Sequence, residues 1–418
     1  MNLTKIAINT LLLCVFPIRL LIVWMPILGY PHVATFFAMI EYLCILYLIL
    51  QSFSFHNKAN KAFSWYYLLY WIYSLFLIYY IIIHPLIPRD SMLSIPLKDS
   101  RVIQDIITIG LICPLIAKFH VCVDYIRFSK ISAILLYGIL IIYALTQNIA
   151  VYTFIRSLDN DMLGDYGLVS ALVLGQYISM AFFFSLWVKD YWTSNKTINS
   201  IIFVITLLFT LFFLLILTQR GPMLFFLLTL LYYIYSRYSI NFKTIFTILV
   251  FIALFIIFFN DIVLVVRSIS PDIVDRFLSI QEDGGSGRFG DDNSVYYLAI
   301  RQIRESPFVG SYFRLVSGSI GHYGSYPHNF ILELLMTFGL VFTLPFIWLV
   351  LIAVRNSYKE IHIMSPVGVF GLVYIYIYLS LLTSHSIALD VQAWSSLALI
   401  LSIKKNKETQ IIYNGKKI

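Results

Sequence analysis

The sequence predicts an all-α polytopic membrane protein with about twelve transmembrane helices and one large hydrophilic loop. Hydrophobic residues make up 60% of the 418 residues, charged residues only 12%, and the mean hydropathy is +0.86. Soluble globular chains carry about 25% charged residues. Apolar runs of about 20 residues, each long enough to cross ~30 Å of hydrocarbon as a helix, recur from end to end. The sequence lacks the short alternating segments of a transmembrane β-barrel.

Each apolar run is assigned one helix. The first run is too long for the core of a signal peptide, and no small-residue cleavage site follows it, so we interpret it as an uncleaved first span. The chain then divides into nine helices within residues 1–262, a loop at 263–327, three helices within 328–403 and a basic tail at 404–418. The predicted helices are 6–28, 33–54, 62–83, 102–118, 131–150, 167–188, 198–217, 221–236, 244–262, 328–353, 365–382 and 387–403.

Lysine and arginine gather in alternate connections and in the tail, whereas the intervening connections hold acidic residues. Positively charged connections stay on the cytoplasmic side, so both termini are predicted in the cytoplasm and the 84–101 and 263–327 loops on the opposite side. The net charge of +8 therefore reflects membrane orientation and does not indicate nucleic-acid binding. The four cysteines have no metal-ligand spacing, so the sequence predicts neither a metal site nor disulfides.

The 263–327 loop is predicted to hold two short amphipathic helices that rest on the membrane domain. Residues 272–280 space their apolar side chains at helical intervals, and 295–303 does the same with Val295, Ala299, Ile300 and Ile303. A Gly-rich turn at 284–287 separates them. At this size the loop is too small to form an independent domain.

Arg220 is a candidate anion-binding residue at the start of the helix predicted at 221–236. Pro222 suits the first turn of a helix, where a missing N–H is tolerated. The unpaired N–H groups of that turn, the positive helix end and a guanidinium together suit an anion. The alternative is an interfacial arginine whose side chain extends to water.

His328 and Asn329 open the helix predicted at 328–353. A histidine at the positive end of a helix tends to stay neutral, as a general base must be. Glu333, one turn further on, could orient Asn329, and it is an ionisable group that needs a partner in the membrane. The alternative is a capping His–Asn pair without chemistry.

The 263–327 loop contains six arginines and no lysine, among them Arg267, Arg288, Arg301 and Arg304. Arginine matches phosphate or carboxylate oxygens in bidentate geometry better than lysine does. The alternative is a solvated loop in which seven acidic residues balance these charges.

Arg19 and Glu41 are predicted to form a structural ion pair. Each lies about ten residues from the short turn near Tyr30, so at ~1.5 Å per residue they reach a similar depth in the first two helices. Either charge alone would cost ~3 kcal/mol near the middle of the bilayer.

The ordered motifs resemble the O-antigen polymerase/ligase superfamily, which includes Wzy-type polymerases, lipopolysaccharide O-antigen ligases and related protein oligosaccharyltransferases. The resemblance covers the helix count, the loop position and the C-terminal half of the chain. The motifs are Thr218-Gln219-Arg220-Gly221, Gly287-Arg288, Ser306-Pro307-Phe308-Val309-Gly310 and Pro327-His328-Asn329, the last followed by Glu333 and Gly339.

The resemblance implies a C-type glycosyltransferase-like fold in the bacterial inner membrane and a metal-independent, inverting glycosyl transfer at its periplasmic face. It implies a glycan on undecaprenyl diphosphate as donor and, as acceptor, a sugar hydroxyl either on a second lipid-linked glycan or on lipid A–core. Membrane lipid and a chain-length regulator protein are the further partners, and no cofactor is expected. His328 matches the catalytic base, and Arg220 and Arg288 match the diphosphate-binding arginines. Supporting roles are assigned to Asn329, Glu333, Arg267, Arg301 and Arg304.

Three functions remain open from the sequence. The predicted function is that of an O-antigen polymerase, which joins lipid-linked repeat units. The alternative is a ligase, which uses the same type of site to transfer the glycan to lipid A–core. A polysaccharide flippase would also suit about twelve helices, but such transporters typically show two related halves and midplane polar residues. The sequence contains no half repeat, which favours the two enzymes over the flippase.

Overall fold

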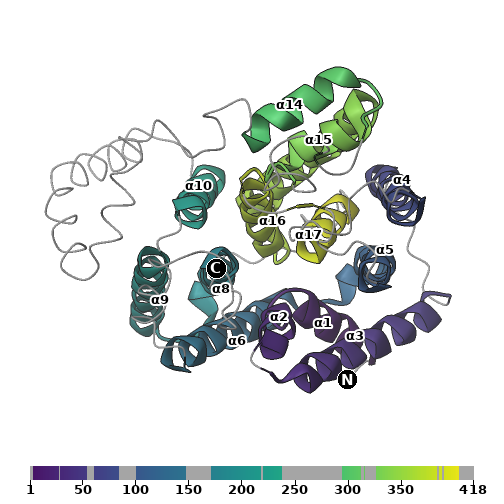
Figure 1. The fold of residues 1–418 in the computed structure, drawn as a ribbon. Helices are drawn as coiled ribbons and strands as arrows, with labels where there is room; N and C mark the ends of the chain where they lie inside the picture. Colours follow the sequence, from purple (N-terminus) through teal and green to yellow (C-terminus); the bar gives the residue numbers. More distant parts are fainter. Residues whose placement is uncertain are drawn as a thin grey trace, which may run out of the picture.

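The computed structural model describes residues 3–27, 29–53, 61–83, 100–146, 171–217, 220–237, 294–311, 315, 326–383, 386–387 and 390–403. All regular elements within these ranges are helices (Figure 1). They are α1 (Leu3–Val15), α2 (Arg19–Ile27), α3 (Pro31–Ser52), α4 (Lys61–Ile83), α5 (Ser100–Phe119), η1 (His120–Cys122), α6 (Tyr125–Thr146), α8 (Ala171–Trp187), η2 (Lys189–Tyr191), α9 (Lys196–Ile216), α10 (Arg220–Arg237), α14 (Val295–Glu305), α15 (Phe330–His362), α16 (Gly368–Ser380) and α17 (Val391–Ser402).

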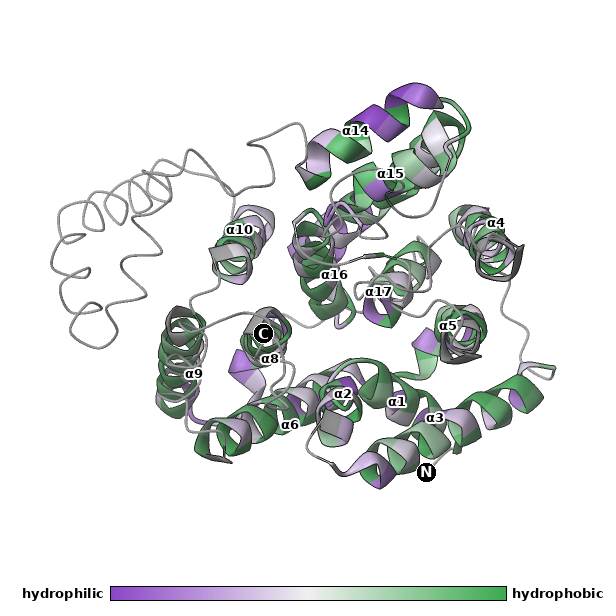
Figure 2. Ribbon diagram, viewed as in Figure 1, coloured by the Kyte–Doolittle hydropathy of each residue, from purple (hydrophilic) through white to green (hydrophobic). Residues whose placement is uncertain are grey.

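The fold is an all-α membrane protein. Within the described ranges, six helices are long and apolar enough to cross a membrane, and the bent pair α1–α2 would make a seventh. Figure 2 shows hydrophobic residues around most of the circumference of these helices, as expected where lipid covers the outside. The total of about twelve spans stays a prediction, since the helix expected at 244–262 lies outside the described residues.

Two short helices, α16 and α17, form the centre of the bundle (Figure 1). α16 packs against α8, α10, α15 and α17, and every residue of α17 is buried. Their 13 and 12 residues give lengths of about 20 Å, less than the ~30 Å hydrocarbon thickness. Both were predicted to be longer, at 365–382 and 387–403.

The connection between α16 and α17 is longer than predicted because a side chain caps the second helix late. The Oδ1 atom of Asp390 accepts a hydrogen bond from Ala393 N at 2.9 Å, so α17 begins at Val391. The described residues of this connection, 381–383, 386–387 and 390, lie in turns or irregular backbone. Such backbone is tolerated in a membrane protein only where protein or a polar cavity surrounds it.

The prediction of one continuous first helix at 6–28 is wrong, because the chain breaks between α1 and α2. Pro17 has no N–H to donate to the carbonyl of Leu13, and that carbonyl accepts from Ile18 N at 2.8 Å instead. The two helical pieces are bent by 52°. Arg19 thereby becomes the first residue of α2.

The helix predicted at 328–353 is longer, and it is interrupted. α15 continues to His362, so it includes Arg355 and Lys359, two of the basic residues that the predicted bounds place in the connection after residue 353. Gly339 divides it with φ 61° and ψ −166°, a combination that only glycine adopts readily.

The segment Ser306–Gly310 fills the interruption of α15. Its carbonyl groups at Pro307 and Phe308 accept from Leu340 N and Val341 N at 2.9 and 3.0 Å, the N–H groups that the break releases. Ser311 N in turn donates to Met336 O at 2.9 Å. The sequence motif at 306–310 thus attaches the preceding loop to α15.

α14 confirms the amphipathic helix expected at 295–303 and lies along α15 (Figure 1). Ser294 caps it, and Leu298 and Ala299 pack against Met336 of α15. Ile300, predicted on the buried face, is 41% exposed, so that part of the prediction is wrong. The buried stripe is rotated toward Leu298, and the buried residues are Tyr296, Leu298, Ala299 and Gln302. The helix expected at 272–280 lies outside the described residues.

Candidate functional site

Two helix starts that carry sequence motifs meet at one turn. Arg220 is the first residue of α10, and a Cβ built on the adjacent Gly221 would lie 3.6 Å from Thr383 Oγ1. Pro222 packs closely on α8, since a Cβ built on Gly175 would lie 2.7 Å from the Cβ of Pro222. The start of α10 is therefore held between α8 and the turn that follows α16.

The start of α15 contacts the same turn. Phe330 N donates to Leu381 O at 3.0 Å, and the side-chain amide of Asn329 donates to Leu382 O at 3.0 Å. The Oδ1 atom of Asn329 also caps α15, accepting from Ile331 N and Leu332 N at 3.0 and 3.1 Å. Residues Leu381–Thr383 thus bring the beginnings of α10 and α15 together. We call this turn and the two helix starts the helix-start cluster.

His328 sits immediately before this cap. Its φ of 49° lies in the left-handed region, which is uncommon for a residue with a side chain. The imidazole is half-buried and stands 4.3 Å, centroid to centroid, from the ring of Tyr326. Asn329, the next residue in the chain, makes the hydrogen bonds described above. These bonds fix the backbone from which the side chain of His328 projects.

Glu333 connects α15 to the α16–α17 connection. Its side chain is 1% exposed, Oε1 accepts a hydrogen bond from Ser386 Oγ at 2.5 Å, and Oε2 accepts from Ile387 N at 3.2 Å. The sequence suggested that Glu333 orients Asn329. In the structure these contacts of Glu333 go to residues 386–387, and the amide of Asn329 is held by Leu382.

The loop arginines divide into two groups. Arg301 and Arg304 are exposed on α14, and Arg301 Nε lies 4.0 Å from Glu305 Oε1. Arg267 and Arg288 lie outside the described residues, as does the side chain of Arg220. Within the described residues, the helix-start cluster therefore contains the backbone at Arg220 together with His328 and Asn329.

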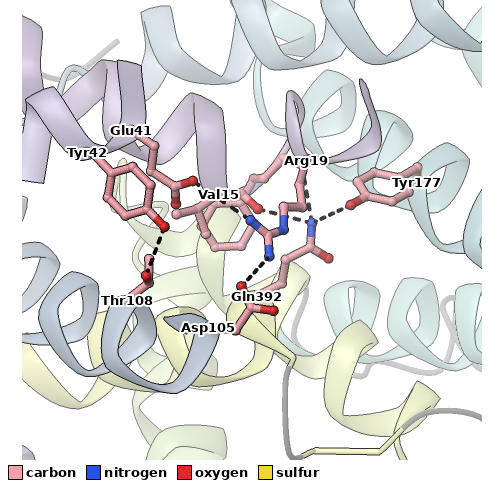
Figure 3. Close-up of polar contacts among 9 residues, drawn as sticks. Val15, Arg19, Glu41, Tyr42, Asp105, Thr108, Tyr177 and Gln392 are labelled. Carbon is pink, nitrogen blue, oxygen red and sulfur yellow. Dashed lines mark hydrogen bonds and ion pairs between the residues drawn. The ribbon is translucent and has the colours of Figure 1, made fainter. Parts of the chain in front are cut away.

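A second polar cluster lies at the break between α1 and α2, and we call it the helix-break cluster (Figure 3). Arg19 Nη1 lies 3.8 Å from Glu41 Oε2, which is the ion pair that the sequence predicts. Arg19 Nη2 also lies 4.0 Å from Asp105 Oδ1 of α5. Figure 3 shows the guanidinium between the two carboxylates.

Gln392 of α17 completes this cluster. Its Nε2 atom lies within hydrogen-bond distance of Val15 O and Phe16 O, at 3.3 and 3.2 Å, at the end of α1. It also lies 3.1 Å from the hydroxyl of Tyr177, and its Oε1 accepts from Gln176 Nε2 at 3.0 Å. These contacts tie the broken helix to α8 and to the start of α17.

Sequence reasoning missed Asp105, Gln176 and Gln392 as members of this cluster. Two signals were available: Pro17 inside the first apolar run, and single glutamines inside two strongly apolar helices. A buried amide requires partners, and a proline inside a helix releases carbonyl groups that can provide them.

Among the described residues, no group of three or more His, Cys, Asp or Glu side chains is arranged to hold a metal ion. Comparison with known proteins finds no matching family model, curated protein or solved structure.

Proposed function

We propose that this chain is an O-antigen polymerase, a membrane glycosyltransferase that joins undecaprenyl-diphosphate-linked oligosaccharide repeat units at the periplasmic face of the inner membrane. The observation that carries the proposal is the helix-start cluster. The Arg-Gly motif at 220–221 and the His-Asn motif at 328–329 are separated in the chain, yet Gly221 lies beside Thr383 and Asn329 donates a hydrogen bond to Leu382.

The proposed reaction requires two functions side by side. A hydroxyl of the acceptor sugar attacks the anomeric carbon of the donor glycan while the bond from that carbon to the diphosphate breaks. His328 takes the hydroxyl proton as a general base. Arg220 and Arg288 stabilise the negative charge that develops on the departing diphosphate, which fixed donors can do without a metal.

The geometry around His328 supports a positioned base. Asn329 anchors the start of α15 through its cap and through Leu382, and Glu333 anchors the α16–α17 connection one turn further along. A base held by a rigid backbone keeps its orientation toward the acceptor, and orientation is a large part of enzymatic rate. Asn329 and Glu333 are therefore positioning residues in this proposal.

The site also suits a lipid-linked substrate. The diphosphate of such a substrate lies at the membrane surface, where a helix start offers a positive dipole end even when, as at α15, its first N–H groups are already hydrogen-bonded. α10 and α15 both begin at the shared turn, so the two dipole ends point to the same region. An anion placed there is favoured even before the arginine side chains contribute.

A transporter is the second candidate, and one observation favours it. Broken helices with polar side chains at the break are typical binding sites of secondary transporters, and α1–α2 with Arg19, Glu41 and Gln392 has this form. Purified protein that elongates lipid-linked repeats without an energy source would exclude transport as the principal activity.

Loss of the gene separates the two enzymatic functions. A polymerase deletion leaves lipopolysaccharide with a single repeat unit on the core, because ligation continues without elongation. A ligase deletion leaves core with no repeat attached. The single-repeat pattern supports the proposal, and bare core would replace it with the ligase.

A further inference from the structure

Phe308 and Val309 are apolar side chains on the outer surface of the segment that fills the break in α15, and we call them the exposed pair. Their exposed fractions are 65% and 69%. They belong to the loop predicted at 263–327, where side chains would face water. A contiguous apolar patch on a protein surface marks a place that another molecule covers.

The apolar surface of the exposed pair continues along α15. Val341 N donates to Phe308 O at 3.0 Å, and Val341 is itself 67% exposed. Three further side chains of α15 at helical spacing are more than half exposed: Leu344, Trp348 and Leu351. Since α15 is long and apolar enough to cross a membrane, this stripe faces lipid. The exposed pair thus lies at one end of a lipid-facing surface.

The backbone of the segment is turned toward α15 and partly paired there. The carbonyl groups of Pro307 and Phe308 accept from N–H groups of α15, and Gly310 N donates to Ser306 O at 3.0 Å. Gly310 has φ 72°, and a Cβ there would collide with the backbone of Thr337. Backbone polar groups that enter hydrocarbon must find partners within the protein. These bonds make the segment better suited to the edge of a membrane than an open loop.

Charged side chains precede the exposed pair and mark where water or lipid headgroups begin. α14 packs its apolar stripe on α15, while Arg301, Arg304 and Glu305 are exposed. Figure 2 shows the hydrophilic end of α14 beside the mostly hydrophobic α15. Long charged side chains keep their ends in the polar region of a membrane. Glu305, the last exposed charge before the pair, lies three residues before Phe308.

We propose that Phe308 and Val309 insert among the acyl chains of the surrounding phospholipid bilayer and anchor α14 at the membrane surface. The occupant is bilayer lipid, because the exposed pair continues the lipid-facing stripe of α15 and follows a helix with an exposed charged face, as in helices that lie at membrane interfaces. Part of the loop expected outside the membrane is therefore within its edge.

Photo-crosslinking of the full-length protein identifies the molecule that covers the exposed pair. Val309 and Val341 are replaced, one at a time, by an amino acid with a short alkyl diazirine, and the protein is placed in nanodiscs of phosphatidylcholine and phosphatidylglycerol. Irradiation should attach phospholipid at both positions. Glu305 is the matched control: its side chain is 64% exposed, and the diazirine there should give little lipid adduct.

Two crosslinking results overturn the proposal. One is the lack of lipid adduct at position 309 while position 341 is labelled, which would place Val309 in water. The other is an adduct at position 309 with a second copy of the chain or with another segment of the same chain in place of lipid.

Hydrogen exchange of Val309→Asp provides a second measurement. Hydrocarbon disfavours an aspartate by a factor of up to about 100, so the segment should leave the break in α15 more often. Exchange at the amides of Leu340 and Val341 should rise by about tenfold or more in nanodiscs, and should stay near the wild-type rate in Val309→Thr. Unchanged exchange in Val309→Asp would overturn the insertion. Neither measurement depends on glycosyl transfer.

Discussion

Gly339→Ala is a substitution for which the structure predicts a large local effect. Gly339 has φ 61° and ψ −166°, and an alanine Cβ there would collide with the backbone of Phe308. Backbone atoms cannot move aside as the end of a flexible side chain can. The Ser306–Gly310 segment must therefore leave the break in α15, or α15 must change its path.

The magnitude follows from the contacts that depend on this close approach. A residue with a Cβ in this region of φ/ψ space costs about 1–3 kcal/mol. Displacing the segment also removes three backbone hydrogen bonds, from Leu340 N, Val341 N and Ser311 N, each with a net value of about 0.5–1.5 kcal/mol. Together these terms give about 2.5–7.5 kcal/mol for local opening.

Hydrogen exchange measures this opening at the amides concerned. Exchange at Leu340, Val341 and Ser311 should accelerate by about 60-fold or more in Gly339→Ala, since each 1.4 kcal/mol is a factor of ten. Gly138→Ala is the control: it lies within α6, and a Cβ there meets no atom within 4 Å. Equal exchange in the two variants would refute the reasoning about the interruption.

Other substitutions give graded outcomes. Gln392→Leu should lower stability by about 1–3 kcal/mol in thermal unfolding, because it leaves the buried carbonyls of Val15 and Phe16 without their donor; an unchanged melting temperature would contradict this. Glu305→Gln, which removes an exposed ion pair with Arg301, should change stability by less than about 1 kcal/mol. Arg220→Lys should abolish most repeat-unit elongation, since lysine cannot contact a diphosphate in bidentate geometry; full activity would exclude the diphosphate role.

The fold class could be predicted from hydropathy, because lipid requires apolar helices wherever the chain crosses it. The amphipathic α14 could be predicted from the helical spacing of its apolar side chains. The interruptions could not be placed in the same way. A hydropathy average does not register Pro17 or Gly339, since the residues around them are as apolar as any other span. α17 begins at Val391, later than the predicted residue 387, because Asp390 caps it. That single residue lies within an apolar run.

The part of the polar sites that could be predicted consists of charged residues, because a charge inside a membrane requires a partner. Arg19 and Glu41 lie at similar distances from one turn, and their charges require partners, so their pairing follows from helix geometry. Asp105 and Gln392 come from α5 and α17, and only the packing of the bundle brings them to the same break. For the same reason, the shared turn at Leu381–Thr383 had no signal in the sequence.

Elongation of purified lipid-linked repeat units by the reconstituted protein tests the proposed activity most directly. Wild-type protein in liposomes, supplied with undecaprenyl-diphosphate-linked repeats and no energy source, should produce a ladder of longer lipid-linked glycans. His328→Ala, inserted and folded to the same extent, should produce none, because the acceptor hydroxyl then lacks its base. A wild-type protein that leaves the repeats unchanged, or a His328→Ala variant that forms the same ladder, would contradict the account.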